Sequence, residues 1–418
     1  MKIMMISINY WPEVTGIGAF TTYRAEYLAA SGHEVEVCTT FPYYPEWKVK
    51  GKYKYKLWQN ENKNDVKISR TWAYVPAKVR SFKRILHEAS FSLSVLLRAL
   101  LCRKPDVMLV VSPPLGLAMV AITLSKLWGI PYVFDVEDLQ PDSAADMGML
   151  PLWTVKVLYF IERAAYRHAG LISTITRGMK DKIASKGDWE KKIVLFEPRM
   201  NASLLNTTNS EADAFCRKYD LENKFFVTHS GNMGVKQALG TVVEAAKIMA
   251  MEEEYCFLLV GDGSAREEIY QKVLNEGLRN ITFLPLLEDE DYRGVLAASG
   301  VCLVTQQKTV SEIAFPSKIV SYFSAGCPVI VSANESCEVA RTVNESGAGF
   351  VVPAEDAEAL VEAIREVKEQ DKAEMERNAR NYAIQRWSDR RVLGYLEKCL
   401  VRAAGKERLY QPQEEVNQ

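Results

Sequence analysis

The stretch SEIAFPSKIVSYFSAGCPVI, residues 311–330, carries the clearest signals for the fold. Pro316 suits the start of a helix, where its missing N–H is not needed. Gly326 followed by Pro328 ends that helix, and the apolar residues 329–331 are typical of a buried strand. Lys318 falls in the predicted first turn, where the helix dipole disfavours a cation. A phosphate group bound beside Lys318 would explain its presence there.

Two more glycine-rich turns follow strand-like runs in the same half of the chain. HSGNMG (229–234) follows the apolar run 225–229, and VGDGS (260–264) follows the run 256–260. We expect each turn to open a helix, with small residues that let backbone amides face an anion. Three successive units of strand, loop and helix with this chemistry predict a site for a nucleoside diphosphate.

Strands and helical stretches alternate along all 418 residues, which predicts an α/β fold with parallel sheets and crossover helices. This length suggests two domains. Polar and turn residues cluster at 196–209, so we expect a first domain over 1–200 and a second over 201–385. Residues 386–418 are expected to form a helix that packs back toward the first domain and ends in a frayed tail. The expected strands are 3–8, 34–39, 106–111, 131–134 and 171–174 in the first half, and 225–229, 256–260, 301–305, 328–331 and 349–352 in the second.

The turn PEVTGIGAF (12–20) could be read as the start of a dinucleotide fingerprint. Against this, Thr21 takes the third glycine position, the approach from Ile8 to Gly16 is long, and no acid lies near 39–41. A dehydrogenase is therefore a weak hypothesis. A plain glycine turn stays open beside a ligand-binding loop at the carboxyl end of a parallel strand, where open α/β sheets bind their ligands.

Composition excludes several classes of protein. The net charge of −1 argues against a dedicated nucleic-acid binder. The eight cysteines include no CxxC pair, which argues against a zinc ribbon and favours a reducing, cytoplasmic compartment. Histidines and acids show no metal-ligand spacing, so we expect no metal and no cofactor. The first residues lack the pattern of a signal peptide, and no long uncharged apolar run predicts a spanning helix.

Taken together, the motifs resemble those of the GT-B glycosyltransferases of the large retaining family 4, with most similarity to colanic-acid and O-antigen type sugar transferases. The resemblance covers nearly the whole chain and rests on six stretches in the family's order: INYWPEVTGIGAF (8–20), LAASGHEVEVCTTFPYYPEW (28–47), FDVEDLQPDSA (134–144), HSGNMGVKQAL (229–239), VGDGSAREEI (260–269) and FPSKIVSYFSAGCPVI (315–330).

This resemblance implies two Rossmann-like domains that face a central cleft. The second domain would bind a nucleotide sugar of the UDP or GDP type, and the first would bind the acceptor. Gly16 and Gly18 would form a loop that approaches the donor diphosphate, and backbone groups near 284–287 would contact the base. The implied donor-binding residues are Gly16, Gly18, Gly231, Asn232, Met233, Gly234, Gln237, Gly261, Asp262, Gly263, Leu286, Leu287, Pro316, Ser317, Lys318 and Ser321.

The sequence departs from the family's pattern at the diphosphate and ribose positions. Many members carry two glutamates eight positions apart, where this chain has Ile313 and Ser321. The nearest acid, Glu312, is expected near the donor sugar. Asn232 and Gln237 stand where many members carry Arg and Lys, so phosphate neutralisation is expected to shift to Lys318 and to backbone amides.

Catalysis with retention would depend mainly on stabilising the departing diphosphate, a role that suits Lys318 and the backbone amides. The acceptor hydroxyl also needs a group that accepts its hydrogen bond or proton. We favour Asp138, in the acidic cluster after the strand 131–134, with Glu137 and Asp142 behind it. The alternative is that Asp138 caps the turn that follows it.

Residues 78–104, KVRSFKRILHEASFSLSVLLRALLCRK, surround an apolar helical centre with basic side chains. This pattern fits a helix lying on anionic lipid, and it equally fits an ordinary core-facing helix with a basic rim. We expect peripheral association with the inner face of the cytoplasmic membrane and a lipid-linked glycan acceptor.

Two other classes of function stay open. A nucleotide-sugar 2-epimerase shares the implied architecture but needs no acceptor. A catalytically idle scaffold of a polysaccharide assembly would fit the missing glutamate at Ser321. Incubation with UDP-sugars in the absence of acceptor distinguishes an epimerase from a transferase. Nucleotide binding distinguishes an idle scaffold, which need bind no nucleotide, from an enzyme.

Overall fold

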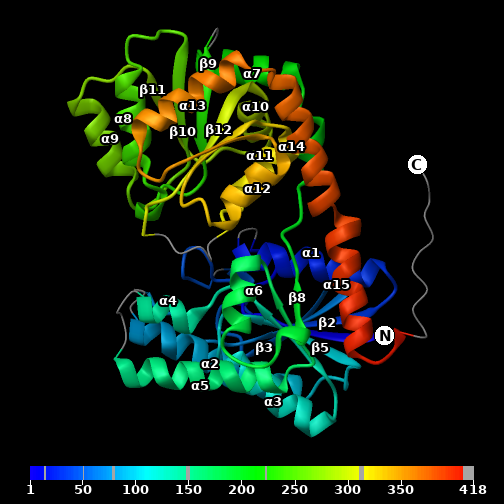
Figure 1. Cartoon of the computed structure of the whole chain (residues 1–418). Helices are drawn as coiled ribbons and strands as arrows, with labels where there is room; N and C mark the ends of the chain where they lie inside the picture. Colours follow the sequence, from blue (N-terminus) through cyan, green and yellow to red (C-terminus); the bar gives the residue numbers. More distant parts are fainter. Residues whose placement is uncertain are drawn as a thin grey trace. The chain divides into compact units, whose positions relative to one another are not determined.

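The computed structural model describes residues 1–13, 16–49, 51–77, 81–146, 151–221, 224–309 and 315–407. The chain divides into two compact units (Figure 1). Unit 1 consists of Met1–Phe196 together with Leu393–Gln418, and unit 2 of Glu197–Val392. Each unit is built on its own mainly parallel sheet with helices packed against it, so the α/β class with two Rossmann-like domains is confirmed.

Unit 1 contains an eight-stranded sheet in the order β3-β4-β2-β1-β5-β6-β7-β8. Every pair of neighbouring strands is parallel except the antiparallel pair β3–β4. Strand β5 is buried along its whole length because helices cover both faces of the sheet. The strands are β1 (Lys2–Ile6), β2 (Glu34–Thr40), β3 (Trp58–Lys63), β4 (Val66–Thr71), β5 (Val107–Ser112), β6 (Tyr132–Val136), β7 (Leu171–Thr174) and β8 (Ile193–Leu195).

The helices of the first 196 residues of unit 1 are α1 (Gly16–Ala30), α2 (Ser81–Ala99), α3 (Leu117–Trp128), α4 (Gln140–Asp146), α5 (Leu152–His168) and α6 (Arg177–Ala184). Helix α2 contacts α3, and α3 contacts α5. In the described part of the chain, no helix has both the length and the apolar character needed to cross a membrane.

The last helix, α15 (Asp389–Ala403), belongs to unit 1 from Leu393 onward. Its side chains Leu393, Leu396 and Leu400 are buried in the same hydrophobic cluster as Ile3 of β1. The chain therefore returns to its first sheet after completing unit 2. The preceding helix, α14 (Lys372–Trp387), ends before Ser388, so the helix expected within 386–418 is α15, which begins at Asp389 and ends at Ala403.

Unit 2 contains a six-stranded parallel sheet in the order β11-β10-β9-β12-β13-β14. Its strands are β9 (Phe225–Ser230), β10 (Tyr255–Val260), β11 (Ile281–Leu284), β12 (Ser299–Thr305), β13 (Val329–Ser332) and β14 (Gly349–Val352). Its helices besides α14 are α7 (Asn209–Tyr219), α8 (Leu239–Ile248), α9 (Arg266–Asn275), α10 (Asp289–Ala298), α11 (Lys318–Ala325), α12 (Glu338–Ser346) and α13 (Ala357–Glu369).

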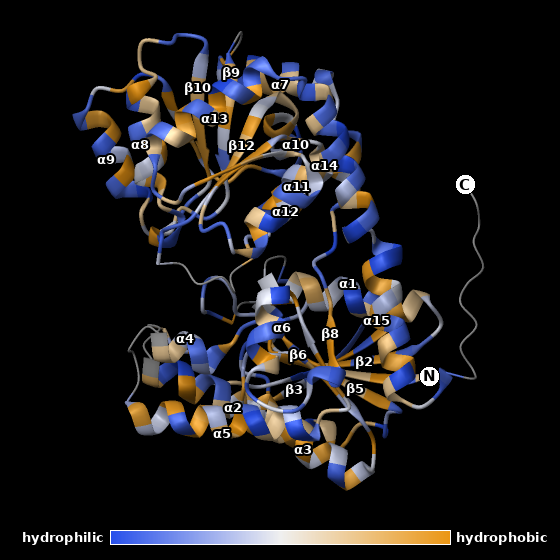
Figure 2. Cartoon of the chain, in the orientation of Figure 1, coloured by the Kyte–Doolittle hydropathy of each residue, from blue (hydrophilic) through white to orange (hydrophobic). Residues whose placement is uncertain are grey.

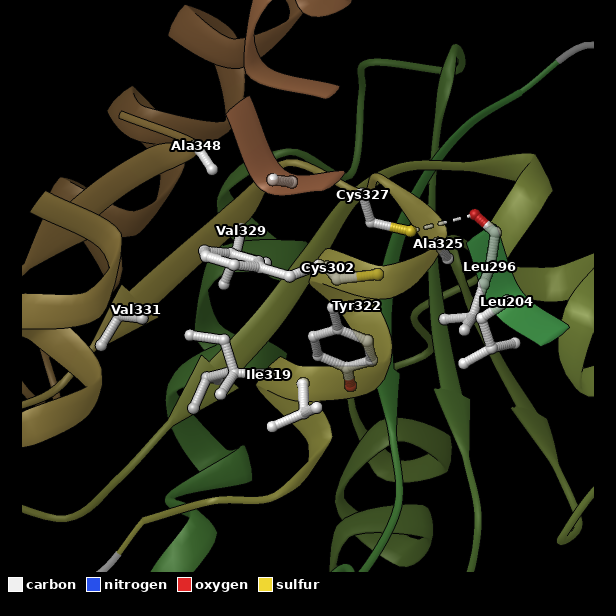
Figure 3. Packing of buried hydrophobic residues seen from close by; sticks show 14 of the residues in the cluster. Leu204, Leu296, Cys302, Ile319, Tyr322, Ala325, Cys327, Val329, Val331 and Ala348 are labelled. Carbon is white, nitrogen blue, oxygen red and sulfur yellow. Dashed lines mark hydrogen bonds between the residues drawn. The ribbon is translucent and has the colours of Figure 1, made fainter. Parts of the chain in front are cut away.

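A hydrophobic cluster of unit 2 fixes α11 against the sheet. Figure 3 shows Ile319 and Tyr322 of α11 beside Val329 and Val331 of β13. In the same cluster the thiol of Cys327 donates a hydrogen bond to the carbonyl oxygen of Leu296 at 3.2 Å. This packing holds the first residue of α11, Lys318, at a defined place relative to the ends of the strands.

Two expected boundaries are wrong. Helix α1 begins at Gly16, so Gly16 and Gly18 are helical residues and do not form a loop. Helix α8 begins at Leu239, after a short 3₁₀ turn over Val235–Gln237, so the turn 229–234 does not open a helix directly. Anion binding at that turn cannot use the N-terminus of α8 and would depend on individual backbone amides and side chains.

Candidate active site

The turns that follow β9 and β10 lie directly against each other. The amide of Gly231 donates to the carbonyl oxygen of Val260 at 2.9 Å. Gly261 has a φ of +124°, and a Cβ atom there would lie 2.1 Å from the carbonyl oxygen of Gly231. Only glycine therefore fits at position 261. The sequence predicts that these glycines bind a ligand, and this stays a prediction. The structure gives Gly261 a packing role.

The next residues of both turns continue this contact. Met233 donates its amide proton to the carbonyl oxygen of Asp262 at 2.8 Å, and the amide of Ala265 donates to the carbonyl oxygen of Met233 at 2.9 Å. A Cβ atom on Gly263 would lie 2.5 Å from the carbonyl carbon of Met233. A Cβ atom on Gly234 would lie 3.0 Å from Nδ2 of Asn232. The predicted residues from 231 to 234 and from 261 to 263 are thus brought together in one compact structure.

Lys318, the first residue of α11, points its amine into this structure. Its Nζ donates to Oε1 of Gln237 at 2.9 Å and lies 3.4 Å from Nε2 of His229. A Cβ atom on Gly231 would lie 3.7 Å from Cε of Lys318. Burial lowers the pKa of Lys318 to about 7. Burial and the nearby Lys318 charge lower the pKa of His229 well below its usual value, so this histidine is neutral.

A tyrosine that the sequence analysis missed fixes α11 to the end of β9. The hydroxyl group of the buried Tyr322 accepts a hydrogen bond from the amide of Ser230 at 2.9 Å and donates one to the carbonyl oxygen of Ser230 at 3.0 Å. Both backbone groups at the last residue of β9 are therefore held by α11. Tyr322 is a positioning residue, because it holds the helix that carries Lys318.

The other predicted donor-binding residues of unit 2 lie around these turns or apart from them. Ser321 forms a side-chain hydrogen bond with Tyr292, whose pKa is raised to about 12 by burial. Asp262 is exposed, and its Oδ1 accepts a hydrogen bond from the amide of Gly263 at 2.8 Å. Leu286 is exposed, whereas Leu287 packs against the core of unit 2. Pro316 and Ser317 directly precede α11, and Glu312 lies outside the described residues.

In unit 1, the buried Glu13 joins two segments at the carboxyl end of the sheet. Its Oε1 accepts hydrogen bonds from the amides of Tyr43 and Tyr44, both at 2.8 Å. Its Oε2 accepts one from Nδ2 of Asn9 at 2.8 Å. Burial raises the pKa of Glu13, while these hydrogen bonds oppose that shift. Glu13 could not be identified from the sequence, because a lone acid in a turn gives no signal of its burial.

Gly18 lies against the same glutamate. A Cβ atom on Gly18 would lie 2.9 Å from the carbonyl oxygen of Glu13, which is too close. Gly16 has a φ of +57° and would have open space for a Cβ atom. The structure therefore gives a local reason for each glycine, a close backbone approach at Gly18 and a left-handed conformation at Gly16. Their contact with a donor diphosphate stays a prediction.

Arg24 of α1 forms a buried ion-pair cluster at the end of β6. Its Nη1 donates to Oδ2 of Asp135 at 2.6 Å and to Oε1 of Glu137 at 2.8 Å. Oδ1 of Asp135 accepts a further hydrogen bond from Ser173 at 2.7 Å. Burial raises the pKa of Glu137 to about 7, although the Arg24 charge opposes this shift. This cluster links α1 to the strand that precedes the predicted catalytic acids.

The two remaining acids of that segment have different surroundings. Asp138 is exposed, and its Oδ1 accepts a hydrogen bond from the hydroxyl of Ser143 at 3.1 Å. Asp142 is buried, and its carboxylate forms a short ion pair with Lys186. Lys186 also pairs with Glu162 at 2.8 Å, so Asp142 belongs to a network that holds α4 against α5. Of Glu137, Asp138 and Asp142, only Asp138 is exposed to solvent.

Among the described residues, one group of metal-ligating side chains has its ligand atoms within 4.8 Å of one another, namely Glu36, Cys38 and Cys102. None of them is a predicted site residue.

Comparisons with known proteins identify both units. Residues 15–198 match the glycosyl transferase 4-like domain, and residues 213–386 match the glycosyl transferases group 1 family. The chain is 32% identical over 376 residues to the putative colanic acid biosynthesis glycosyl transferase WcaI of Escherichia coli K12, covering 88% of this chain and 92% of that protein. It is 23% identical to the probable glycosyltransferase WbjE of Pseudomonas aeruginosa over 77% of this chain and 80% of that one.

Solved structures share the fold. HepE of Anabaena in complex with UDP matches with a TM-score of 0.69 and 17% identity, over 96% of this chain and all (100%) of that one. The sucrose-phosphate synthase of Thermosynechococcus elongatus matches with a TM-score of 0.73 and 18% identity, over 96% and 99% of the two chains. With one family model on each unit and a relative of 32% identity along most of its length, this chain belongs to the group 1 glycosyltransferases and is a glycosyltransferase of the GT-B fold.

Proposed function

We propose that the chain transfers a sugar from a nucleoside diphosphate sugar to a hydroxyl group of a glycan, with retention at the sugar carbon, in the synthesis of a cell-surface polysaccharide. The observation that carries the proposal is the amine of Lys318, held beside Gly231 by Gln237 at the carboxyl end of β9. The name of WcaI supports a role in polysaccharide synthesis, and the HepE structures with UDP and UDP-glucose support the donor class.

The donor diphosphate would lie against the turns after β9 and β10. An approaching diphosphate favours the protonated amine, so Lys318 gains full charge when the donor binds. The charged amine then stabilises the negative charge that develops on the leaving diphosphate. Because Gln237 is uncharged, the positive charge of Lys318 is not neutralised in advance. We also propose that Glu312 lies near the donor sugar and that backbone groups near Leu286 and Leu287 contact the base. The proposed mechanism uses no metal.

In unit 1, the carboxylate of Asp138 would accept the hydrogen bond or proton of the attacking hydroxyl. Its exposure leaves it open to an acceptor, and Ser143 holds one of its oxygens. Glu137 and Arg24 hold the end of β6 and thereby the position of the neighbouring Asp138. Attack from the face that the diphosphate leaves would retain the configuration.

The acceptor would be a lipid-linked glycan at the inner face of the cytoplasmic membrane. Within the segment 78–104, the described cations Lys83, Arg84, Arg103 and Lys104 are exposed beside exposed apolar side chains. Residues 78–80 of this segment lie outside the described residues. An enzyme bound to the membrane would encounter such an acceptor by diffusion within the plane of the membrane.

A thermal-shift panel of UDP, GDP, ADP and their sugars tests the donor class, because a ligand of the folded state raises its melting temperature. We expect one base to stabilise the wild type and to lose most of its effect in Lys318→Met. A chain that responds to no nucleotide would contradict the proposal and favour an idle scaffold. Conversion of a UDP-sugar to its 2-epimer without acceptor would favour the epimerase.

A further inference from the structure

Helices α2, α3 and α5 of unit 1 contain many hydrophobic residues (Figure 2). Helix α2 packs against α3 and α3 against α5, and all three carry exposed apolar side chains. Half of the exposed large hydrophobic side chains in the described part of the chain lie in or directly after these three helices. They are Phe82, Ile85, Leu86, Leu93, Leu97, Leu100 and Leu101 at α2, Met119 and Leu127 on α3, and Leu152, Trp153, Val157 and Phe160 on α5. Exposed apolar side chains gathered on neighbouring helices in this number are typical of an interaction surface.

The pattern along α5 separates a core side from an outer side. Val155, Ala165 and Tyr166 are buried, whereas Trp153 is 70% exposed and Phe160 is 73% exposed. Trp153, Val157 and Phe160 follow one another at spacings of four and three residues, so they share one face of the helix. The buried residues of α5 lie on its other side, so these aromatic rings are left exposed by the described residues of the unit.

The charges on the three helices select the kind of partner. Their sequences contain two acids, Glu88 and Glu162, and neither is exposed. Glu88 pairs with Arg84 at 3.1 Å, and Glu162 pairs with Lys186. The exposed cations on the helices are Lys83 and Arg84 on α2, Lys126 on α3, and Lys156, Arg163 and Arg167 on α5. Six exposed cations against two acids that are not exposed leave these helices with an excess of positive charge, even though Arg84 is paired. A surface that combines exposed apolar groups with such an excess suits an anionic bilayer, which offers both acyl chains and negative headgroups.

The strand directions place this surface next to the candidate acceptor site. Helix α2 follows β4, α3 follows β5, and α5 follows β6 by way of α4. These strands run parallel in one sheet, so all three helices begin at its carboxyl edge. The most exposed side chains, Leu152 at 81% and Phe82 at 76%, stand in the first turns of α5 and α2. Asp138 lies at the same edge, directly after β6.

We propose that the outer faces of α2, α3 and α5 form one docking surface for an anionic lipid bilayer, with Trp153 and Phe160 inserted among the acyl chains and the cations at the headgroups. The surface thus extends beyond the segment 78–104, and α5 supplies its inserting side chains. A lipid-linked acceptor could then keep its tail in the leaflet while its glycan reaches Asp138. This last step rests on the proposed function, whereas docking itself does not.

Flotation of the full chain with vesicles tests the surface without donor or acceptor. One set of vesicles contains phosphatidylcholine alone, and the other also contains phosphatidylglycerol. The variants are Trp153→Gln with Phe160→Gln on α5, and Lys83→Gln with Lys156→Gln for charge. The matched control is Met251→Gln with Leu274→Gln, since these side chains are 92% and 54% exposed in unit 2. Thermal unfolding checks that every variant stays folded.

We expect the wild type to float with anionic vesicles and to be released by salt. The α5 variant should bind about tenfold less tightly or weaker, because two large apolar groups no longer insert. Each neutralised cation should weaken binding by roughly fivefold at low salt. When the wild type binds vesicles, part of its tryptophan emission should shift to the blue because Trp153 enters the acyl chains. Trp153→Phe should lack this blue-shifted part.

Three results would overturn the proposal. Wild type that does not float with anionic vesicles excludes the bilayer as partner. An α5 variant that floats as well as the Met251 and Leu274 control excludes α5 from the surface. Wild type that forms a dimer by light scattering, with the α5 variant monomeric, assigns the surface to self-association. Because nucleotide binding is measured separately and without lipid, a failure here leaves the proposed transfer reaction standing.

Discussion

The amine of Lys318 donates a hydrogen bond of 2.9 Å to the side-chain amide oxygen of Gln237. Gln237 is a neutral partner for this lysine, whose amine lies near the carboxyl end of β9. Burial lowers the pKa of this lysine to about 7, and no carboxylate of the described residues forms an ion pair with its amine. The positive charge at this position is therefore incomplete near neutral pH until an anion arrives. Lys318 and Gln237 come from segments 81 residues apart, joined by the packing of α11 against the sheet.

Replacing Gln237 with Glu should weaken binding of a nucleoside diphosphate. The new carboxylate would pair with Lys318, raise its pKa and repel the diphosphate. Two unit charges about 6 Å apart interact by about 3 kcal/mol at an effective dielectric constant of about 20, and the fully charged lysine offsets part of this. We expect affinity to fall by about tenfold or more in calorimetric titration. Gln237→Asn is the control, and equal losses in both variants would show that shape alone matters.

Replacing Glu13 with Ala should lower turnover while nucleotide binding by unit 2 is retained. The change leaves the buried amide of Tyr43, and that of Tyr44 beside it, without their acceptor, at a cost of about 1–3 kcal/mol for each such group. The segments around residues 9–13 and 41–45 would then lose their fixed positions. Steady-state kinetics and a UDP or GDP titration measure the two effects. Turnover at the wild-type level would show that these segments take no part in the reaction.

The pKa of Glu137, raised by burial to about 7, predicts a specific dependence of stability on pH. Between about pH 4.5 and 7 the folded chain keeps a proton on Glu137 that the unfolded chain releases. Protonated Glu137 therefore contributes fully to the free energy of unfolding below the pKa that Glu137 has in the unfolded chain. This contribution is lost as pH rises through about 7. Urea unfolding across pH 5 to 8 should therefore show a flatter decline for Glu137→Gln than for wild type. The exposed Glu369→Gln is the control, and identical curves for wild type and Glu137→Gln would refute the assignment.

Replacing Asp138 with Asn should lower turnover by about 10²-fold or more, the usual loss for a group that accepts a proton in the reaction. Donor affinity should not change. Ser143→Ala removes the hydrogen bond to Asp138 without removing the carboxylate, so it distinguishes catalysis from turn capping. If Asp138→Asn and Ser143→Ala cause the same small loss, Asp138 only caps the turn.

Much of the fold could be predicted because buried strands and amphipathic helices leave continuous apolar runs. The strands over Leu171–Thr174 and Gly349–Val352 have the expected bounds. The hairpin of β3 and β4 was missed, since β3 alternates between exposed and half-exposed positions and contains mainly polar residues. Its turn, Asn64 and Asp65, has φ values of 49° and 60°, and this Asn-Asp pair was the available signal.

The candidate site could be predicted where one short segment carries the signal. Lys318 at the start of its helix and Gly326 at its end follow directly from local chemistry. Arg24, Glu13 and Tyr322 could not be predicted, because their roles depend on partners distant in the sequence. Arg24, for example, pairs with Asp135, 111 residues away. Spacing within a helix says nothing about such contacts, which only the packed fold creates.

Proton uptake on nucleotide binding measures whether Lys318 gains its charge when a donor diphosphate binds. Calorimetric titration at pH 8 in two buffers of different ionisation enthalpy measures it, with the nucleotide that the thermal-shift panel selects. In the protein without nucleotide the pKa of Lys318 is about 7, so most of its amine is neutral at pH 8. Binding of the diphosphate should therefore be accompanied by uptake of close to one proton. The Lys318→Met variant should take up none and bind at least about tenfold more weakly. Equal affinity and equal proton uptake in the two proteins, or no binding of any nucleotide, would show that Lys318 does not gain its charge from a bound diphosphate.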